Sequence, residues 1–303
     1  MPALAFNTHL KRFAGHALLS SGVLRPALRR HKAIFMLHRV CAGPVPRWQE
    51  TLAVQQQDFE AWLCWLHRHF TLVDLMTCLE DPLPRPAGQK PLASLTFDDG
   101  WADNLSLAMP VLEKHRIPAS IFLATGFIGT QRRFWWETLS DTVWNPTPEA
   151  MQALREAARA RDLPRPPDLQ GPAQARWLQL HAWLEALKAH PTHEREALAN
   201  AVPGSRVHAL RIEDVQRMEA SGLIRFGPHS VSHALLDQLD DAHLDAEIRD
   251  SMTQVHDWCT HPLPVFCYPN GSEDARVRLA VARAGIPWGL ATGGQLVSTG
   301  SDP

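Results

Sequence analysis

Short apolar runs alternate along the chain with stretches whose apolar residues recur at helical spacing. A short apolar run bounded by polar residues predicts a buried strand, and an apolar stripe at spacings of three and four predicts an amphipathic helix. The predicted strands are 33–37, 71–75, 93–97, 119–125, 223–227, 264–268 and 288–292. Strands that alternate with helices in this way predict a parallel sheet covered by helices.

The helical stripes lie between the predicted strands. In 56–70 the stripe is formed by Phe59, Trp62, Leu63, Leu66 and Phe70. In 241–259 it is formed by Leu244, Ile248, Met252, Val255 and Cys259, with Asp240 as the predicted N-cap. Residues 103–115 and 273–284 are also predicted to be helical.

Repeated strand–helix units of this kind favour a closed or nearly closed barrel over an open doubly wound sheet. No glycine-rich phosphate loop follows the first predicted strand, which also disfavours a dinucleotide-binding fold. The predicted fold class is therefore α/β, a barrel of parallel strands and helices. Active sites of such barrels gather at the carboxyl ends of the strands, so the residues after each strand are the candidates for chemistry.

Residues 128–212 are too long for one crossover and predict a helical insertion over the barrel mouth. The predicted organisation is an N-terminal helical segment over 1–32 and a barrel over 33–303 that contains this insertion. The insertion carries FWWE at 134–137 and a helical pattern formed by Trp177, Leu180, Trp183, Leu184 and Leu187. Its tryptophans either stack on sugar rings or pack the insertion onto the barrel, and packing is favoured for any single tryptophan.

Composition and charge limit the partners and the location that can be expected for this protein. The 303 residues carry a net charge of −2 and no long run of Lys or Arg, so a nucleic-acid partner is not expected. The five cysteines are scattered without a C-x-x-C pair, which predicts reduced thiols rather than disulfides. The first 32 residues show no convincing signal peptide and no membrane span, and predict an amphipathic helix on a membrane or on the barrel. We therefore expect a location in the cytoplasm or at the inner membrane surface.

Two predicted strands end in residues that can bind a metal. Asp98 and Asp99 follow the strand 93–97. His229 and His233 follow the strand 223–227 at a spacing of four, which predicts that they lie on one face of a helical turn. One carboxylate and two imidazoles form a common catalytic metal set, in which the second carboxylate can take a proton from water. One alternative for Asp98 and Asp99 is a strand-end turn with a cap for the next helix, although Asp103 is already available as that cap. The alternative for the histidines is a pair that binds no ligand.

These segments carry a family resemblance. TFDDG at 96–100 followed by HSVSH at 229–233 resembles the polysaccharide deacetylases, carbohydrate esterase family 4. FMLHRV at 35–40, FLATGFIG at 122–129, FWWE, and FCYPNG at 266–271 resemble the branch linked to exopolysaccharide synthesis. The resemblance covers roughly residues 33–295. It implies a distorted (β/α)7 barrel, here with the helical insertion, and a carbohydrate substrate.

The resemblance also implies roles for residues. Asp98 matches the catalytic base, and Asp99, His229 and His233 match the ligands of a divalent metal, with Zn²⁺ as the expected ion. His38 matches the general acid of relatives whose barrel is circularly permuted, with a structural rim histidine as the alternative. Tyr268, Pro269 and Asn270 are expected to line the pocket, with the backbone N–H of Asn270 near the oxyanion, and Trp101 to border the substrate.

Two departures from the family pattern leave alternatives open. Many relatives have an arginine, which orients the catalytic aspartate, where Cys267 stands, and a tyrosine where Asn270 stands. The resemblance implies removal of N-acetyl groups from an N-acetylated glycan, such as an N-acetylglucosamine polymer or precursor. The alternatives are hydrolysis of other non-peptide C–N bonds on the same fold, and a non-catalytic glycan-binding protein. The oligomeric state stays open.

Overall fold

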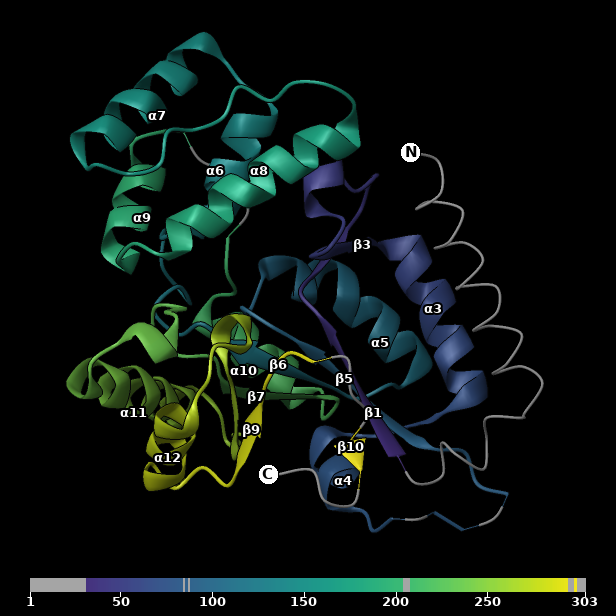
Figure 1. Ribbon diagram of the computed structural model, residues 1–303. Coiled ribbons are helices and arrows are strands. Elements are labelled where there is room, and N and C mark those ends of the chain that lie inside the picture. Colours follow the sequence, from purple (N-terminus) through teal and green to yellow (C-terminus); the bar gives the residue numbers. More distant parts are fainter. Residues whose placement is uncertain (1–30, 84, 87, 204–207, 294–296, 299–303) are drawn as a thin grey trace.

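The computed structural model describes residues 31–83, 85–86, 88–203, 208–293 and 297–298 (Figure 1). The predicted N-terminal helical segment over 1–32 lies outside the described residues, apart from His31 and Lys32. These two residues begin the first strand, β1. No helix in the described ranges has both the length and the apolar character needed to span a bilayer.

A parallel sheet forms the centre of the molecule. β1 pairs with β5, β5 with β4 and β6, and β6 with β7, all in parallel register. β8 and β9 form a second parallel pair. The segment before β8 is hydrogen-bonded to β7, because Leu263 N donates to Phe226 O at 2.7 Å. The bounds are β1 His31–Leu37, β4 Thr71–Leu72, β5 Leu92–Phe97, β6 Ala119–Leu123, β7 Ile224–Pro228, β8 Val265–Cys267 and β9 Trp288–Leu290.

All seven predicted strands are thus confirmed, and their arrangement is that of a distorted (β/α)7 barrel. Three short strands were not predicted. β2 (Arg39–Cys41) pairs with β3 (Ala53–Gln55), and β10 (Val297–Ser298) runs antiparallel to β1. β4 is shorter than predicted because the Asp74 carboxylate accepts the backbone N–H of Thr77 and so begins a helix at Leu75.

Helices cover the outer face of the sheet, as the buried strands require. Every residue of β5 is buried, and Phe97 packs against Phe59 of the first helix. The covering helices are α3 Gln56–His69, α4 Leu75–Glu80, α5 Met109–His115, α10 Ile212–Ala220, α11 Asp241–Trp258 and α12 Ala275–Arg283.

Two predicted caps have different outcomes. Asp240 caps α11, since its carboxylate accepts the backbone N–H of His243 at 2.9 Å. Asp103 does not cap the helix that follows it, so that prediction is wrong. Its carboxylate instead accepts hydrogen bonds from Arg39 Nε at 2.9 Å and from Val40 N at 3.2 Å. The following segment, Asn104–Ala108, is π-helical and leads into α5.

The described part of the predicted insertion, residues 128–203 and 208–212, contains four helices that lie wholly within it and a hydrophobic core of its own. The helices are α6 Trp135–Trp144, α7 Pro148–Ala160, α8 Ala173–Lys188 and α9 Thr192–Asn200, grouped above the barrel in Figure 1. Their core includes Trp135, Trp183 and Leu187, and Trp48 of the short 3-10 helix η1 (Arg47–Gln49) packs into it. Trp48 and a hydrogen bond from Arg47 to Gln174 attach the insertion to the barrel rim.

Candidate active site

The turn after β5 directs its two carboxylates apart. Asp98 continues the strand, because its N–H donates to Leu37 O at 2.9 Å. Asp99 and Gly100 then adopt left-handed backbone with φ of 73° and 79°. A Cβ at position 100 would lie 2.7 Å from Leu123 Cδ2, so the turn requires glycine there. This conformation is costly for a non-glycine residue such as Asp99, and strain of this kind is concentrated at functional sites.

The two histidines reach the same place from a loop, not from the helical turn that their spacing predicted. The loop follows β7, and Ser230 and His233 have left-handed φ values of 59° and 56°. Glu247 of α11 holds the loop, because its carboxylate accepts hydrogen bonds from Val231 N at 2.7 Å and from the N and Oγ of Ser232 at 2.9 and 2.6 Å. Glu247 therefore supports the site, and no motif in the sequence indicated it.

Asp99, His229 and His233 form a buried group that we call the cation cluster. Asp99 Oδ1 lies 3.2 Å from His233 Nε2 and 3.6 Å from His229 Nε2. His229 Nδ1 donates to Cys267 O at 2.8 Å, which leaves Nε2 directed at Asp99. The carboxylate is 1% exposed, and its Oδ1 is a buried atom without a hydrogen-bond partner. A buried, unpartnered carboxylate oxygen requires a ligand or an ion to satisfy it.

Electrostatics give Asp99 and His229 the protonation states of metal ligands. Burial alone would raise the pKa of Asp99, but the close contact and charge of His233 and the charges of His38 and His229 outweigh it and hold this pKa below its usual range. Burial and the neighbouring His233 lower the pKa of His229 to about 3. An ionised carboxylate and a neutral imidazole are the forms that bind a cation.

These residues fit a divalent cation. Ligand atoms held about 2.0–2.2 Å from a tetrahedral Zn²⁺ lie about 3.3–3.6 Å from one another. The two Asp99 separations of 3.2 and 3.6 Å match this spacing within the tolerance of such sites. A second possible set, Asp98, His229 and Cys267, shares His229. That set is disfavoured because the Cys267 thiol already donates to Asp98 Oδ1 at 3.6 Å.

Asp98 differs from Asp99 in its environment. Burial raises the pKa of Asp98 to about 6 and the charge of Asp99 adds to this rise, while His38 and the Cys267 hydrogen bond oppose it. Burial and the Asp98 charge in turn raise the pKa of the Cys267 thiol well above its usual value, so the thiol stays protonated and donates. A neutral thiol therefore contacts Asp98 where many relatives would place an arginine.

A cavity of about 300 Å³ joins these residues to the insertion. Its floor contains Asp98 and the cation cluster, and His38 at the end of β1 and Asn270 after β8 also line it. The insertion contributes further lining residues from α6 and α8: Trp135, Trp136, Ser140, Trp177, Leu180, His181, Leu184, Glu185 and Lys188. The structure thus brings together six of the nine predicted site residues.

Three predicted pocket residues lie elsewhere. Trp101 is 1% exposed and does not line the cavity, because its ring is packed against Phe134 and its Nε1 donates to Asp99 Oδ2 at 2.9 Å. Tyr268 packs with Phe266 in the core beneath α12 and lines a separate groove. Pro269 is buried and does not line the cavity. Tyr268 and Pro269, which were expected to line the pocket, and Trp101, which was expected to border the substrate, therefore do not line this cavity.

The cavity face of α8 was missed by the sequence pattern. This helix has two stripes: Trp183 and Leu187 enter the core of the insertion, whereas Trp177, His181, Glu185 and Lys188 face the cavity, and Leu180 contributes to both. Trp177 and His181 stack with ring centroids 5.1 Å apart and an interplanar angle of 12°. The signal in the sequence was the second stripe, which is offset from the apolar one by one residue, or about 100° around the helix.

Comparison with known proteins agrees with this geometry. A family model described as polysaccharide deacetylase matches residues 85–160 and 187–288, which is more than half of the chain. The Bacillus subtilis (strain 168) protein YxkH, provisionally named a polysaccharide deacetylase, is 32% identical over 111 residues. That match spans 36% of this chain and 37% of YxkH.

Two solved structures share the fold at low identity. IcaB from Ammonifex degensii superposes with a TM-score of 0.56 at 15% identity, over 90% of this chain and 89% of its own. A de-N-acetylase from Aggregatibacter actinomycetemcomitans superposes with a TM-score of 0.54 at 13% identity, over 90% of this chain and 92% of its own. The likeness extends over the barrel that carries the site.

Proposed function

The chain belongs to the polysaccharide deacetylase family, and from this premise we propose that it is a metal-dependent hydrolase that removes N-acetyl groups from an N-acetylated glycan. One observation carries the proposal: Asp99, with its unpartnered buried oxygen, converges with two histidines beside a second buried carboxylate in a single cavity. The name of the Aggregatibacter protein, a de-N-acetylase, supports the choice of an N-acetyl group.

Asp99, His229 and His233 would hold the cation. A divalent ion at this position supplies positive charge that polarises the acetamide carbonyl and acidifies a water molecule. The chain's own contribution is to keep the three ligand atoms together in a buried pocket, with His229 oriented by its hydrogen bond to Cys267 O. Zn²⁺ is the proposed ion, since a carboxylate and two imidazoles suit it.

Asp98 and His38 would carry the protons. Asp98 takes a proton from the attacking water, for which a pKa of about 6 is well placed near neutral pH. A C–O bond forms at the carbonyl carbon, and the C–N bond then breaks as His38 gives a proton to the leaving nitrogen, because an amide anion is too basic to depart. The products are acetate and the free amine of the sugar. The backbone N–H of Asn270 is the proposed donor to the oxyanion.

The cavity supports a carbohydrate substrate with more than one sugar unit. A volume of about 300 Å³ lies at the lower end of the range for small-molecule sites, and its rim continues along the α8 face. Trp177 and His181 offer a flat aromatic surface there, next to the polar side chains of Glu185 and Lys188. We propose that the sugar to be deacetylated lies at the cation cluster and that a neighbouring sugar contacts this face.

The proposal is tested by acetate release from N-acetylglucosamine oligomers, with and without a chelator, together with the metal content of the purified protein. We expect release that a chelator stops and that Zn²⁺ restores. Activity that persists in chelator, in a protein without bound metal, would contradict the proposal. A parallel assay on small cyclic amides and acylated amines distinguishes a glycan deacetylase from a hydrolase of other C–N bonds, and tight oligomer binding without acetate release would indicate a non-catalytic glycan-binding protein.

A further inference from the structure

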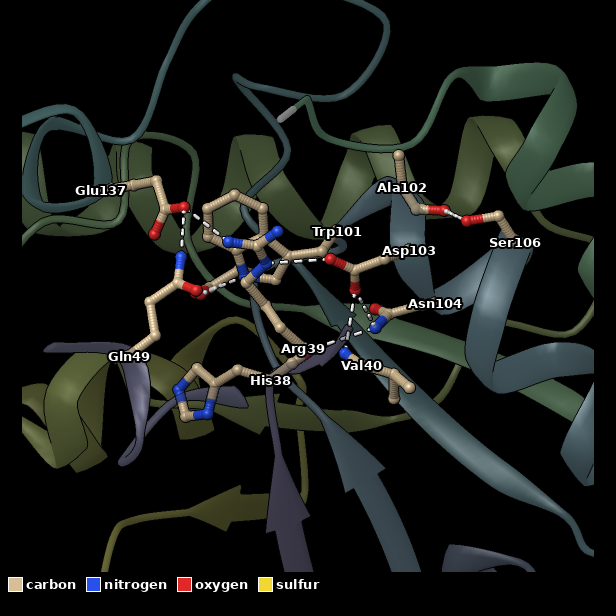
Figure 2. Close-up of polar contacts among 11 residues, drawn as sticks. His38, Arg39, Val40, Gln49, Trp101, Ala102, Asp103, Asn104, Ser106 and Glu137 are labelled. Atoms are coloured by element: carbon tan, nitrogen blue, oxygen red, sulfur yellow. Dashed lines mark hydrogen bonds and ion pairs between the residues drawn. The ribbon is translucent and has the colours of Figure 1, made fainter. Parts of the chain in front are cut away.

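A second group of buried charges lies beside the active site. Arg39 of β2 donates from Nε to Asp103 Oδ2 at 2.9 Å and from Nη1 to Glu137 Oε1 at 2.5 Å (Figure 2). Gln49 Nε2 also donates to Glu137 Oε1, at 2.7 Å. The side chains of Arg39, Asp103 and Glu137, which we call the Arg39 cluster, are 7%, 10% and 4% exposed. The cluster joins the barrel rim to helix α6 of the insertion.

A contribution to folding stability does not by itself explain why the charges of the Arg39 cluster are buried. Burying charged groups carries a desolvation penalty that can exceed the attraction between them, and buried ion pairs are often no more stabilising than apolar residues of similar volume. Here two carboxylates share one guanidinium, and Glu137 Oε2 is buried without a hydrogen-bond partner. The cluster does, however, fix the position of every group that it touches.

One of these groups is a tryptophan that holds a cation ligand. The guanidinium carbon of Arg39 lies 4.7 Å from the centroid of the Trp101 ring, over its face. The opposite end of the indole donates from Nε1 to Asp99 Oδ2 at 2.9 Å. That hydrogen bond occupies one carboxylate oxygen and leaves Oδ1 facing His229 and His233.

The cluster also holds the backbone at His38. Asp103 Oδ1 accepts the N–H of Val40 at 3.2 Å, and the adjacent Asn104 donates from Nδ2 to His38 O at 2.9 Å (Figure 2). His38 directly follows β1 and Asp99 lies in the turn after β5, so the same buried group reaches two sides of the cavity.

We propose that Arg39 is a positioning residue: anchored by Asp103 and by Glu137 of the insertion, it holds the Trp101 indole so that its N–H fixes Asp99 with Oδ1 directed to the cation. The inference rests on the proposed function in taking Asp99 as a cation ligand. It adds that the insertion, through Glu137, helps to set the geometry of the metal site. Trp101 thus acts below the site and not on the substrate.

Cation affinity tests this relay. Trp101→Phe keeps an aromatic ring under Arg39 but removes the N–H, and Arg39→Lys keeps the charge but removes the planar fork. Loss of a group that orients a metal ligand typically weakens binding about 10–100-fold. We expect a loss in that range for Zn²⁺ in each variant, measured by competition with a chromophoric chelator. The double variant should bind no more weakly than the weaker single one, since both changes act through one contact.

A matched control and a spectroscopic readout separate positioning from general loosening. Arg132 also lies over an aromatic ring, 4.6 Å from the Phe127 centroid, and pairs with Glu196. The Phe127 ring, unlike the Trp101 indole, has no N–H that could donate to Asp99. Arg132→Lys should leave Zn²⁺ affinity unchanged. With Co²⁺ as the probe, Trp101→Phe should change the visible spectrum of the bound ion, whereas Arg132→Lys should not.

The outcomes distinguish this inference from the proposed function. A wild-type protein that binds neither Zn²⁺ nor Co²⁺ overturns the proposed function and this inference with it. A wild-type protein that binds them, with Trp101→Phe and Arg39→Lys both within about twofold of its affinity, overturns the inference alone. If Arg39→Lys does not fold, Trp101→Phe with its cobalt spectrum decides the question.

Discussion

Two buried groups of charges lie at the same rim of the barrel and differ in what faces their carboxylates. In the cation cluster an ionised carboxylate faces two imidazoles, and Asp99 Oδ1 has no hydrogen-bond partner. In the Arg39 cluster the guanidinium is held directly by Asp103 and Glu137. In the proposed function the first arrangement holds an ion, whereas the second contains its own counter-charge in Arg39. Trp101 connects them, with Arg39 on one side and Asp99 on the other.

The largest expected effect separates Asp98 from the cation cluster. Asp98→Asn should lower the rate of acetate release by at least about 10³-fold, because the amide cannot accept the proton of water. Bound metal should remain at the wild-type level, since Asp98 is not among the proposed ligands. Asp99→Asn is the matched control one position away, and it should lose the metal. Equal loss of metal in both variants would show that the two roles are reversed or shared.

His38 tests the other side of the cavity with a somewhat smaller effect. His38→Gln should reduce deacetylation of an amide about 10²–10³-fold, because the leaving nitrogen must be protonated. An aryl ester of acetic acid has a leaving group that departs without a proton, so its hydrolysis should fall far less. Parallel kinetics on the two substrates measure the difference. An equal loss on both would make His38 a structural histidine of the rim.

The two groups also differ in how far the sequence could predict them. The cation cluster follows from local patterns, because parallel strands place the residues after β5 and β7 at one rim. The Arg39 cluster joins positions separated by 64 and 98 residues, and each of its charges resembles an ordinary solvated side chain until the fold is known. A pairing of this kind leaves no spacing signature in the chain.

The side-chain directions of Trp101 and Tyr268 were not predicted for a different physical reason. Trp101 follows two left-handed residues, Asp99 and Gly100, and that turn directs the indole beneath the carboxylate instead of into the cavity. Asn270, with φ of 56°, likewise turns the chain after Tyr268, which points into the core. Strand ends can be placed from apolar patterns, but the direction of a side chain in an irregular turn depends on φ and ψ values that the pattern does not contain.

The Arg39 cluster has its own pH signature. Burial raises the pKa of Glu137 to about 7 from a usual 4.5, with Arg39 opposing the rise and Asp141 and Asp103 adding to it. Below pH 4.5 the Glu137 carboxyl is protonated in both the folded and the unfolded protein. Between pH 4.5 and about 7 it is protonated only in the folded protein, so the free energy of unfolding falls as pH rises and levels off above this window. The titration of Glu137 alone should lower the free energy of unfolding by up to roughly 3 kcal/mol across this window.

Glu137→Gln isolates that contribution. The amide oxygen can still accept hydrogen bonds from Arg39 and Gln49, but the group no longer titrates. Urea unfolding at pH 5 and pH 8 should show the wild type losing more of its unfolding free energy than the variant between the two conditions. Parallel losses in the two proteins would mean that Glu137 is ionised throughout and is fully compensated by Arg39.

The smallest expected effect concerns the α8 face, most of which lies in residues 161–186 that the family model does not match. Trp177→Ala should raise KM for an N-acetylglucosamine oligomer about 3–10-fold and leave kcat nearly unchanged, because an aromatic contact contributes on the order of 1 kcal/mol to binding. KM for a small acetanilide, which has no neighbouring sugar to contact α8, should change far less. Leu178→Ala is the matched control, since Leu178 lies on the same helix, is 53% exposed and does not line the cavity. A fall in kcat at constant KM would instead place Trp177 with the groups that organise the cation cluster, and the insertion would then act on chemistry at both Glu137 and Trp177.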